Sequence, residues 1–337
     1  MTGPRKKDTP RRTAGKTTGS EALDRARKTK QRAIIITASV VSLILAIIFI
    51  SLYIGTANFR RTIIIVDDHH VSMDYFLNRA RLTGADSTSM LEVITKEEVV
   101  RIEAAKYGIA VSADDIDREL KRLAESQSGE ISESEYREWY RQQLNESKLS
   151  NSEFRYLIGT NLLMNRFHEM LAERVPTVAE HVHLHLIVLE THSEAEQVRQ
   201  RWEEGEDFAD LARELSLDEE SRENGGDVGW VPRGVLVPAF EYEVFDLSTG
   251  NVTTPIPYST DPGDPSSTEV LFYLFMVSER VDDREIDEDS LNIIKSQALD
   301  MWYSQAVYYH DITYHGLNNG FDSETAAWIS WQLSKSQ

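Results

Sequence analysis

The 337-residue sequence contains no cysteine. This absence excludes disulfide bonds, a thiol nucleophile, a thiolate metal site and the lipid-modified cysteine of a lipoprotein. Acidic residues are abundant instead, with 56 Asp and Glu against 36 Lys and Arg and a formal net charge of −20. A chain of this length is long enough for two domains with additional segments at its ends.

Charge is absent from residues 33–54, an uninterrupted run of 22 uncharged residues. A helix of that length, at about 1.5 Å per residue, reaches the ~30 Å of a bilayer core. Residues 1–32 carry eleven Lys and Arg against three acids, a net +8, so the rest of the chain carries −28 (−20 − 8). Because basic segments stay cytoplasmic, we expect a single transmembrane helix over 33–54, a basic cytoplasmic tail over 1–32 and extracytoplasmic domains after it.

Gly55, Thr56 and Ala57 have the small-x-small pattern of a signal-peptidase site. The apolar run before them is longer than the ~7–15 residues of a signal-peptide core. An uncleaved membrane anchor is therefore favoured, and cleavage after Ala57 stays an alternative. Beside such an anchor, a basic tail suits anionic lipid, so no nucleic-acid partner is expected.

Residues 62–176 are expected to be mainly helical. The β-branched run at 63–66 predicts a short strand, and a helix is expected over 89–107. Three capping boxes, each a serine followed three residues later by an acid, predict further helix starts. They are Ser112/Asp115, Ser132/Glu135 and Ser150/Glu153. The region contains no catalytic cluster.

Residues 180–281 mix strand and helix patterns. Alternation over 181–189 predicts a strand, and Ser193 with Glu196 predicts a capped helix after it. A second helix has apolar residues at i, i+3, i+4 and i+7, namely Phe208, Leu211, Ala212 and Leu215. With a last strand over 270–277, this order predicts a small α/β domain.

The segment 224–230 reads Asn-Gly-Gly-Asp-Val-Gly-Trp. Three glycines in five positions indicate backbone that turns tightly or approaches a neighbour closely. A Gly-Gly pair by itself indicates only a loop. Its neighbours are more specific, since Phe-Ala-Asp-Leu-Ala stands at 208–212 and Arg-Gly-Val-Leu-Val-Pro-Ala-Phe-Glu at 233–241.

These segments, in this order, resemble the parvulin-type peptidyl-prolyl cis-trans isomerases. The family patterns are S-H-I-L-V, F-A-x-L-A, S-x-D followed by G-G-D-L-G-W, R-G-x-M-V-P-x-F-E, and V-x-E-R. The matching segments of this chain are 184–188, 208–212, 216–230, 233–241 and 277–280. The resemblance implies an FKBP-like α/β domain with an antiparallel sheet that acts on X–Pro bonds, and hence an α+β chain.

The resemblance also implies roles for particular residues. Those that bind the substrate proline would be Leu236, Val237 and Phe240. His185 would be the core histidine of the catalytic site. Asp218 would be the polar residue near it, with Glu219 as the alternative because the length of this loop varies.

The last strand departs from the family pattern. Where parvulins have G-[YF]-H-I-I-K-V, residues 271–277 read Leu-Phe-Tyr-Leu-Phe-Met-Val. Tyr273 thus replaces the second histidine of the catalytic site, and its hydroxyl could hydrogen-bond to His185 instead. The preceding loop, 258–267, is also longer than usual. Because some SurA-like chaperones carry parvulin domains that bind peptides without isomerising them, a non-catalytic chaperone is the alternative function.

The region before the isomerase-like domain resembles the N-terminal chaperone module of SurA. The matching segments are 67–76, 105–116, 150–154 and 174–177. The whole chain is therefore similar to extracytoplasmic foldases of the SurA/PrsA type. This resemblance implies an all-α chaperone module at 62–176 and a C-terminal helical extension at 282–337, with a helix over 282–304, that packs on the module.

The expected function is a membrane-anchored extracytoplasmic foldase for unfolded or newly exported polypeptides with X–Pro bonds. A structural adaptor for a membrane partner is a third, less favoured interpretation. Isomerisation breaks no covalent bond and needs no cofactor. His181, His183 and His185 share a strand face by period two, but no second ligand group follows at a readable spacing, so no metal site is expected. The loop at 190–193 lacks Lys and Arg, so no preference for phosphorylated peptides is expected.

Overall fold

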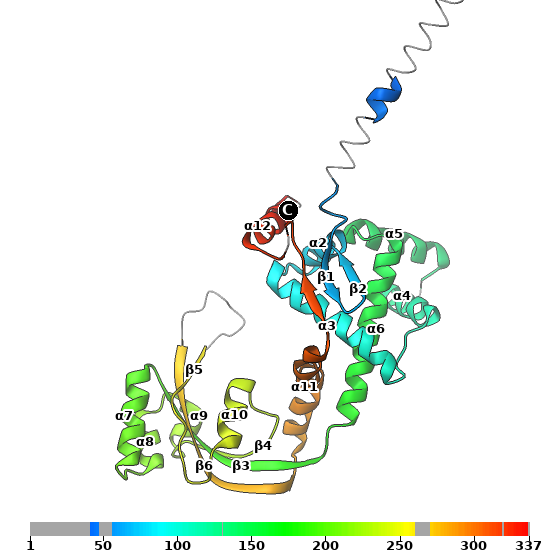
Figure 1. Ribbon diagram of the computed structural model, residues 1–337. Helices are drawn as coiled ribbons and strands as arrows, with labels where there is room; N and C mark the ends of the chain where they lie inside the picture. The colour runs from blue at the N-terminus through cyan, green and yellow to red at the C-terminus, as the bar shows by residue number, and fades with distance from the viewer. Residues whose placement is uncertain (1–40, 47–55, 130, 260–269, 319, 336–337) are drawn as a thin grey trace, which may run out of the picture. The chain divides into compact units, whose positions relative to one another are not determined.

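The computed structural model describes residues 41–46, 56–129, 131–259, 270–318 and 320–335 (Figure 1). Of the expected span at 33–54, only 41–46 are described, and they are helical. The described part of the chain includes no helix with the length and apolar character that crossing a membrane requires. Most of the loop expected to be long, 258–267, also lies outside the described residues.

Contacts divide the chain into two compact units. The smaller comprises Met1–Ile64, His70–Leu77 and Tyr314–Gln337, and the larger Ile65–His69 and Asn78–Thr313. Each is described by itself.

A three-stranded sheet has the order β2-β1-β7. Its strands are β1 (Thr62–Val66), β2 (His69–Ser72) and β7 (Ile312–Tyr314). The strand expected at 63–66 is confirmed, and Ile63 and Ile64 are fully buried. The expectation of an all-α module is wrong here, because a β-branched run favours extended backbone and the returning C-terminal segment pairs with it.

The C-terminal residues of the smaller unit pack around β1. The backbone N–H of His315 donates to the carbonyl of Ile63 at 2.8 Å. Helix α12 (Ser323–Ser334) places Trp328 with its ring centroid 5.4 Å from that of Phe59. Trp328 therefore packs within this unit, whereas Trp331 is half-exposed.

Helix α2 (Met73–Thr83) follows β2, and four helices come after it. They are α3 (Ser87–Lys106), α4 (Ala113–Ser128), α5 (Glu133–Ser147) and α6 (Asn151–Glu173). The three expected capping boxes are confirmed, each with both reciprocal hydrogen bonds. Helix α3 begins two residues before the expected start because Asp86, not Ser89, caps it by accepting from Thr88 N and Ser89 N. Helices α3, α4 and α5 all contact α6.

Helix α11 (Glu288–Ala306) packs against α6 and continues into the 3-10 turn η1 (Val307–Tyr309). The Trp302 and Phe167 ring centroids lie 4.6 Å apart, edge to face. His168 Nε2 lies 2.9 Å from the carbonyl oxygen of Lys295. The helix begins later than the expected 282, because the preceding strand continues to Glu285 and Asp287 is the N-cap.

A second sheet is antiparallel, as expected, and has the order β4-β3-β6-β5 (Figure 1). Its strands are β3 (Val178–Leu189), β4 (Asp227–Pro232), β5 (Ile256–Ser259) and β6 (Val270–Glu285). Strand β6 is eight residues longer than the expected 270–277, since its polar second half pairs with the start of β3, up to the pair Val178 and Glu285.

Helices cover both faces of this sheet. They are α7 (His192–Glu203), α8 (Phe208–Leu215), α9 (Glu219–Arg222) and α10 (Pro238–Asp246). Residues of α7 and α8 pack with Ile187 and Leu274, whereas residues of α10 pack with Leu184 and Phe275 on the other face. The alternation of side chains along each strand makes these two separate cores.

The start of α7 differs from the expectation. The capping box is formed by Thr191 and Glu194, two residues before the expected pair of Ser193 and Glu196. The two patterns overlap in the sequence, and Thr191 directly follows the end of β3, where its extended backbone suits an N-cap.

The glycine segment makes two close backbone approaches. A Cβ on Gly226 would lie 2.5 Å from the carbonyl oxygen of Leu186, and one on Gly225 would lie 2.5 Å from the Cβ of Ala209. Both glycines have positive φ, which is 72° at Gly225 and 77° at Gly226. The carbonyl of Gly226 accepts a hydrogen bond from Leu186 N at 2.8 Å. The expectation of tight turning and close approach is therefore confirmed.

Candidate active site

An aromatic group occupies the α10 face of the four-stranded sheet. The Phe240 ring centroid lies 4.9 Å from each of Tyr258, Tyr273 and Phe275. Phe240 is 9% exposed, and the partly buried Leu236 and Val237 pack against the same core. The structure thus brings the three residues implied to bind proline together with Tyr273.

Local structure explains how Phe240 reaches this position. Helix α10 begins with Pro238, whose fixed φ and missing N–H suit the first turn of a helix. Glu241 Oε1 accepts a hydrogen bond from Gly234 N at 2.8 Å and so closes the turn that carries Leu236. Its Oε2 is buried without a partner in the described residues, and burial raises the pKa of Glu241.

Asp218 lies within electrostatic range of Tyr273. Burial raises the pKa of the Tyr273 hydroxyl, and the negative charge of Asp218 raises that pKa further. The phenol therefore stays protonated at neutral pH and can donate a hydrogen bond. Asp218 is held as the N-cap of α9 by Ser221 N at 3.0 Å, whereas Glu219 is exposed.

His185 lies on the opposite face of the sheet. In the register of β3 with β6 it pairs with Met276, which packs with the α7 and α8 core, and its ring centroid is 6.4 Å from that of Phe208. Tyr273 pairs with Val188 and packs in the other core. The expected hydrogen bond between Tyr273 and His185 is therefore wrong, because residues three apart along a strand face opposite sides.

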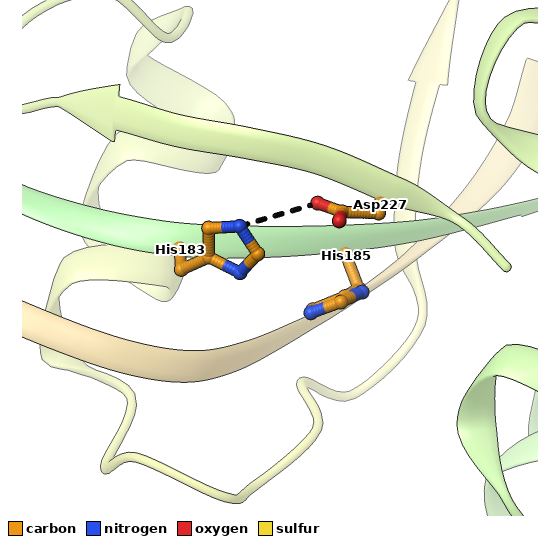
Figure 2. A group of neighbouring side chains, drawn as sticks. All are labelled: His183, His185 and Asp227. Atoms are coloured by element: carbon orange, nitrogen blue, oxygen red, sulfur yellow. Dashed lines mark ion pairs between the residues drawn. The ribbon is translucent and has the colours of Figure 1, made fainter. Parts of the chain in front are cut away.

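His185 instead belongs to a polar group with His183, Asp227 and Ser278. Its Nε2 lies 3.0 Å from Ser278 Oγ, which is also 3.0 Å from His183 Nδ1. His183 Nε2 lies 3.4 Å from Asp227 Oδ1 (Figure 2). Burial lowers the pKa of His185 below its ordinary value, although the nearby Asp227 carboxylate acts in the opposite direction, so His185 is neutral at pH 7.

Asp227 and Ser278 are the residues of this group that the sequence analysis missed. Asp227 stands inside the glycine segment and Ser278 in the terminal V-x-E-R pattern, so both were in matched motifs. Asp227 and Ser278 come close to His183 only because β3 pairs with both β4 and β6.

The aromatic face can assist rotation about a peptide bond without covalent chemistry. An apolar surface can hold a proline ring and remove water from the adjacent amide, and a phenol donor lies beside it. A separate hollow of about 380 Å³ opens toward α7, with Leu189, Val198 and Arg201 among its lining residues. None of the implied site residues lines that hollow.

Comparison with known proteins identifies a related domain family. The profile of the family described as Rotamase, PPIC-type PPIASE domain, matches residues 189–263. The matched range includes Asp218, Leu236, Val237 and Phe240. It begins after His185 and ends before Tyr273.

Curated relatives are foldases and chaperones. Foldase protein PrsA of Oceanobacillus iheyensis is 27% identical over 170 residues, which are 48% of this chain and 54% of that protein. Chaperone SurA of Methylococcus capsulatus is 31% identical over 132 residues, 39% of this chain and 23% of that protein. The chain spans about half the length of the PrsA relatives it matches.

Among solved structures, that of peptidylprolyl isomerase PrsA from Bacillus anthracis is 20% identical, with a TM-score of 0.36, and covers 73% of this chain and 96% of that one. Residues 189–263 thus match the PPIC-type peptidyl-prolyl isomerase domain family, and the chain has homologues among the PrsA foldases and the SurA chaperones.

Proposed function

We propose that this chain is a membrane-anchored extracytoplasmic foldase that speeds cis–trans isomerisation of X–Pro bonds in unfolded or newly exported polypeptides. The observation that carries the proposal is the aromatic face on which Phe240 meets Tyr258 and Tyr273, with Leu236 and Val237 beside it. This face has the apolar character that a proline ring requires.

The reaction demands little of the protein. Rotation about the X–Pro bond crosses a barrier of ~18–20 kcal/mol because the amide loses its resonance as it twists. In the twisted form the lone pair returns to the nitrogen, which becomes a hydrogen-bond acceptor. A site that removes water from the planar amide and offers a donor to the twisted form lowers the barrier.

Tyr273 supplies the donor in this proposal. Its raised pKa keeps the phenol protonated, and Phe240 fixes the plane of its ring from the apolar side. Asp218 acts through Tyr273 as a positioning residue, since its carboxylate is oriented by Ser221 and its charge disfavours loss of the phenol proton. The tyrosine thereby takes the place of the family's second histidine.

The membrane anchor and the clients rest on the N-terminal sequence and on the relatives. Residues 33–54 are uncharged and follow a tail of net charge +8, the arrangement that keeps the tail cytoplasmic. Proteins named foldase PrsA and chaperone SurA are homologues. In this proposal helices α3 to α6 form the surface that receives unfolded chains.

The test is an isomerisation assay with an X–Pro peptide and the detergent-solubilised full chain. Wild-type protein accelerates exchange, and Phe240→Ala removes the acceleration because it deletes the centre of the apolar face. Tyr242→Ala is the matched control, since Tyr242 is on the same helix but 73% exposed. Equal rates for wild type and Phe240→Ala would overturn the proposed site.

A non-catalytic chaperone is the second candidate function. The observation that favours it is the position of His185, which faces away from Phe240 and Tyr273. On this alternative the folded chain suppresses aggregation of an unfolded client and leaves peptide exchange at its uncatalysed rate. A structural adaptor would instead bind one stoichiometric partner and no broad range of peptides.

A further inference from the structure

Three potential metal ligands converge on the α7–α8 side of the sheet. His183 and His185 come from β3, and Asp227 comes from β4 (Figure 2). One donor atom from each of the three lies within 4.8 Å of the others. Donor atoms around a tetrahedral ion with bonds of about 2.0–2.2 Å lie roughly 3.5 Å apart. The 3.4 Å between His183 Nε2 and Asp227 Oδ1 matches that spacing, and side-chain rotations can bring all three donors to it.

Irregular strand pairing creates this convergence. The register of β3 shifts between Leu184 and His185 against β4, and between His183 and Leu184 against β6. Such bulges bend a strand locally and redirect side chains. Here they bring His185 opposite Asp227 and leave both histidines in contact with Ser278.

Ser278 assigns the protons of the two imidazole rings. Its hydroxyl donates to the carbonyl oxygen of His183 at 3.3 Å. With the hydroxyl proton used in that bond, Ser278 Oγ is left as the acceptor for His183 Nδ1–H and His185 Nε2–H, each at 3.0 Å, which is the tautomer assignment on which the proposal rests. The lone pairs consequently remain on His183 Nε2 and His185 Nδ1, the two nitrogens that Ser278 does not occupy.

These lone pairs lack donors. His185 Nδ1 is buried without a hydrogen-bond partner among the residues described. His183 Nε2 faces Asp227 Oδ1 at 3.4 Å, and with the tautomers assigned to Ser278 both atoms are acceptors. Acceptors that face one another are unfavourable unless a cation lies between them. Asp227 Oδ1 is itself oriented by Gly229 N at 2.8 Å.

We propose that His183, His185 and Asp227 bind a divalent transition-metal ion of the zinc class. Two imidazoles and a carboxylate suit zinc, nickel or copper better than magnesium or calcium, which prefer oxygen ligands. The His183 and Asp227 side chains are 23% and 41% exposed, so the ion can enter and keep a water as a further ligand. Ser278 Oγ contacts the nitrogen of each ring that does not bind the ion, as outer-shell groups do at metal sites.

The bound ion joins the edge strand β4 to the central strand β3 and lies on the opposite face from Phe240. The proposal departs from the sequence-based expectation that the chain has no metal site. That expectation rested on the absence of a readable second ligand group, and Asp227 is that group.

The test is calorimetric titration of the chelator-treated, detergent-solubilised full chain with zinc chloride at neutral pH. We expect one zinc ion per chain. His185→Gln and Asp227→Asn should each weaken binding by about tenfold or more. His192→Gln is the matched control, because His192 is an exposed histidine of the same domain and its loss should leave the affinity unchanged.

A second readout uses Trp230, whose ring centroid lies 5.2 Å from that of His183. Nickel or copper bound at the site should quench its fluorescence, and Trp230→Phe should abolish that part of the quenching while binding persists. The half-exposed Asp227→Asn variant leaves its hydrogen-bond acceptor in place, so it tests the site without unfolding the strand. Melting of each variant checks the fold.

The proposal is overturned if wild type binds no zinc, in which case His183 and Asp227 form an ion pair through a proton only. It is also overturned if Asp227→Asn and His185→Gln bind as tightly as wild type, or if His192→Gln alone abolishes binding. Because the readout is binding, none of these outcomes depends on isomerase activity.

Discussion

The rings of Phe240 and Tyr273 meet on one face of the four-stranded sheet, with their centroids 4.9 Å apart. His185, which the family resemblance assigns to the same site, lies on the other face beside Phe208. In the proposed function, the aromatic pair is the part of the site that contacts the proline ring. The tyrosine hydroxyl is the hydrogen-bond donor nearest to it in our account.

Replacing Tyr273 by phenylalanine removes this hydroxyl and keeps the ring. We predict that kcat/KM for an X–Pro peptide falls roughly tenfold, the value of one hydrogen bond in the transition state. Tyr273→His, which restores the family residue, should keep more activity than Tyr273→Phe. Peptide exchange measured for the three proteins decides the point, and an unchanged rate in Tyr273→Phe would exclude the hydroxyl from catalysis.

His185 should make stability fall in acid. Burial is the main cause of its lowered pKa in the folded state, so below its ordinary value of about 6.5 the unfolded chain binds a proton that the folded chain does not. The contribution of neutral His185 to the free energy of unfolding is fully present above about pH 6.5 and is lost as pH falls from there through the folded-state pKa. His185→Gln should flatten this part of a melting-temperature profile, and His192→Gln should not. A profile that His185→Gln leaves unchanged would contradict the prediction.

Glu241 should destabilise the fold when it is ionised. Burial raises its pKa, so the folded state favours the protonated acid and stability increases as pH falls through the folded-state pKa. Glu241→Gln keeps the Oε1 acceptor for Gly234 N and removes the charge. We predict a gain in the free energy of unfolding at pH 7. Denaturation by urea at neutral pH measures it, and a loss of stability would show that the charge is needed.

Gly226→Ala should strongly destabilise the isomerase-like domain. The new methyl would meet the carbonyl oxygen of Leu186 at 2.5 Å on a backbone with positive φ, at a cost of about 2–4 kcal/mol. Gly229→Ala is the matched control, since it has positive φ but open space around it and should cost only about 1–2 kcal/mol. Equal losses in the two variants would show that the close approach to Leu186 contributes nothing.

Local signals in the sequence predicted local structure well. Three capping boxes start α4, α5 and α6 at the expected serines. The glycine segment predicted a close backbone approach, which Gly226 makes to Leu186 of β3, and the family resemblance implied the antiparallel sheet. Each of these features depends on a few neighbouring residues or on a motif of fixed spacing.

Features that depend on strand pairing were missed. The second half of β6 is polar, and only its partner residues at the start of β3 make it a strand. Asp227 lies far from His183 in the sequence, and the register shifts beside Leu184 that bring them together leave no pattern in either segment. The same pairing decides that Tyr273 and His185 face opposite sides.

The central claim is that the Phe240 face turns over X–Pro bonds rather than only holding them. The most direct measurement is two-dimensional NMR exchange between the cis and trans signals of an X–Pro peptide, with a small amount of the full chain in detergent. Our account predicts exchange cross-peaks with wild type and with Tyr242→Ala, and none with Phe240→Ala. Line broadening from binding without cross-peaks, in wild-type protein that is folded, would contradict the account and leave a peptide-binding chaperone.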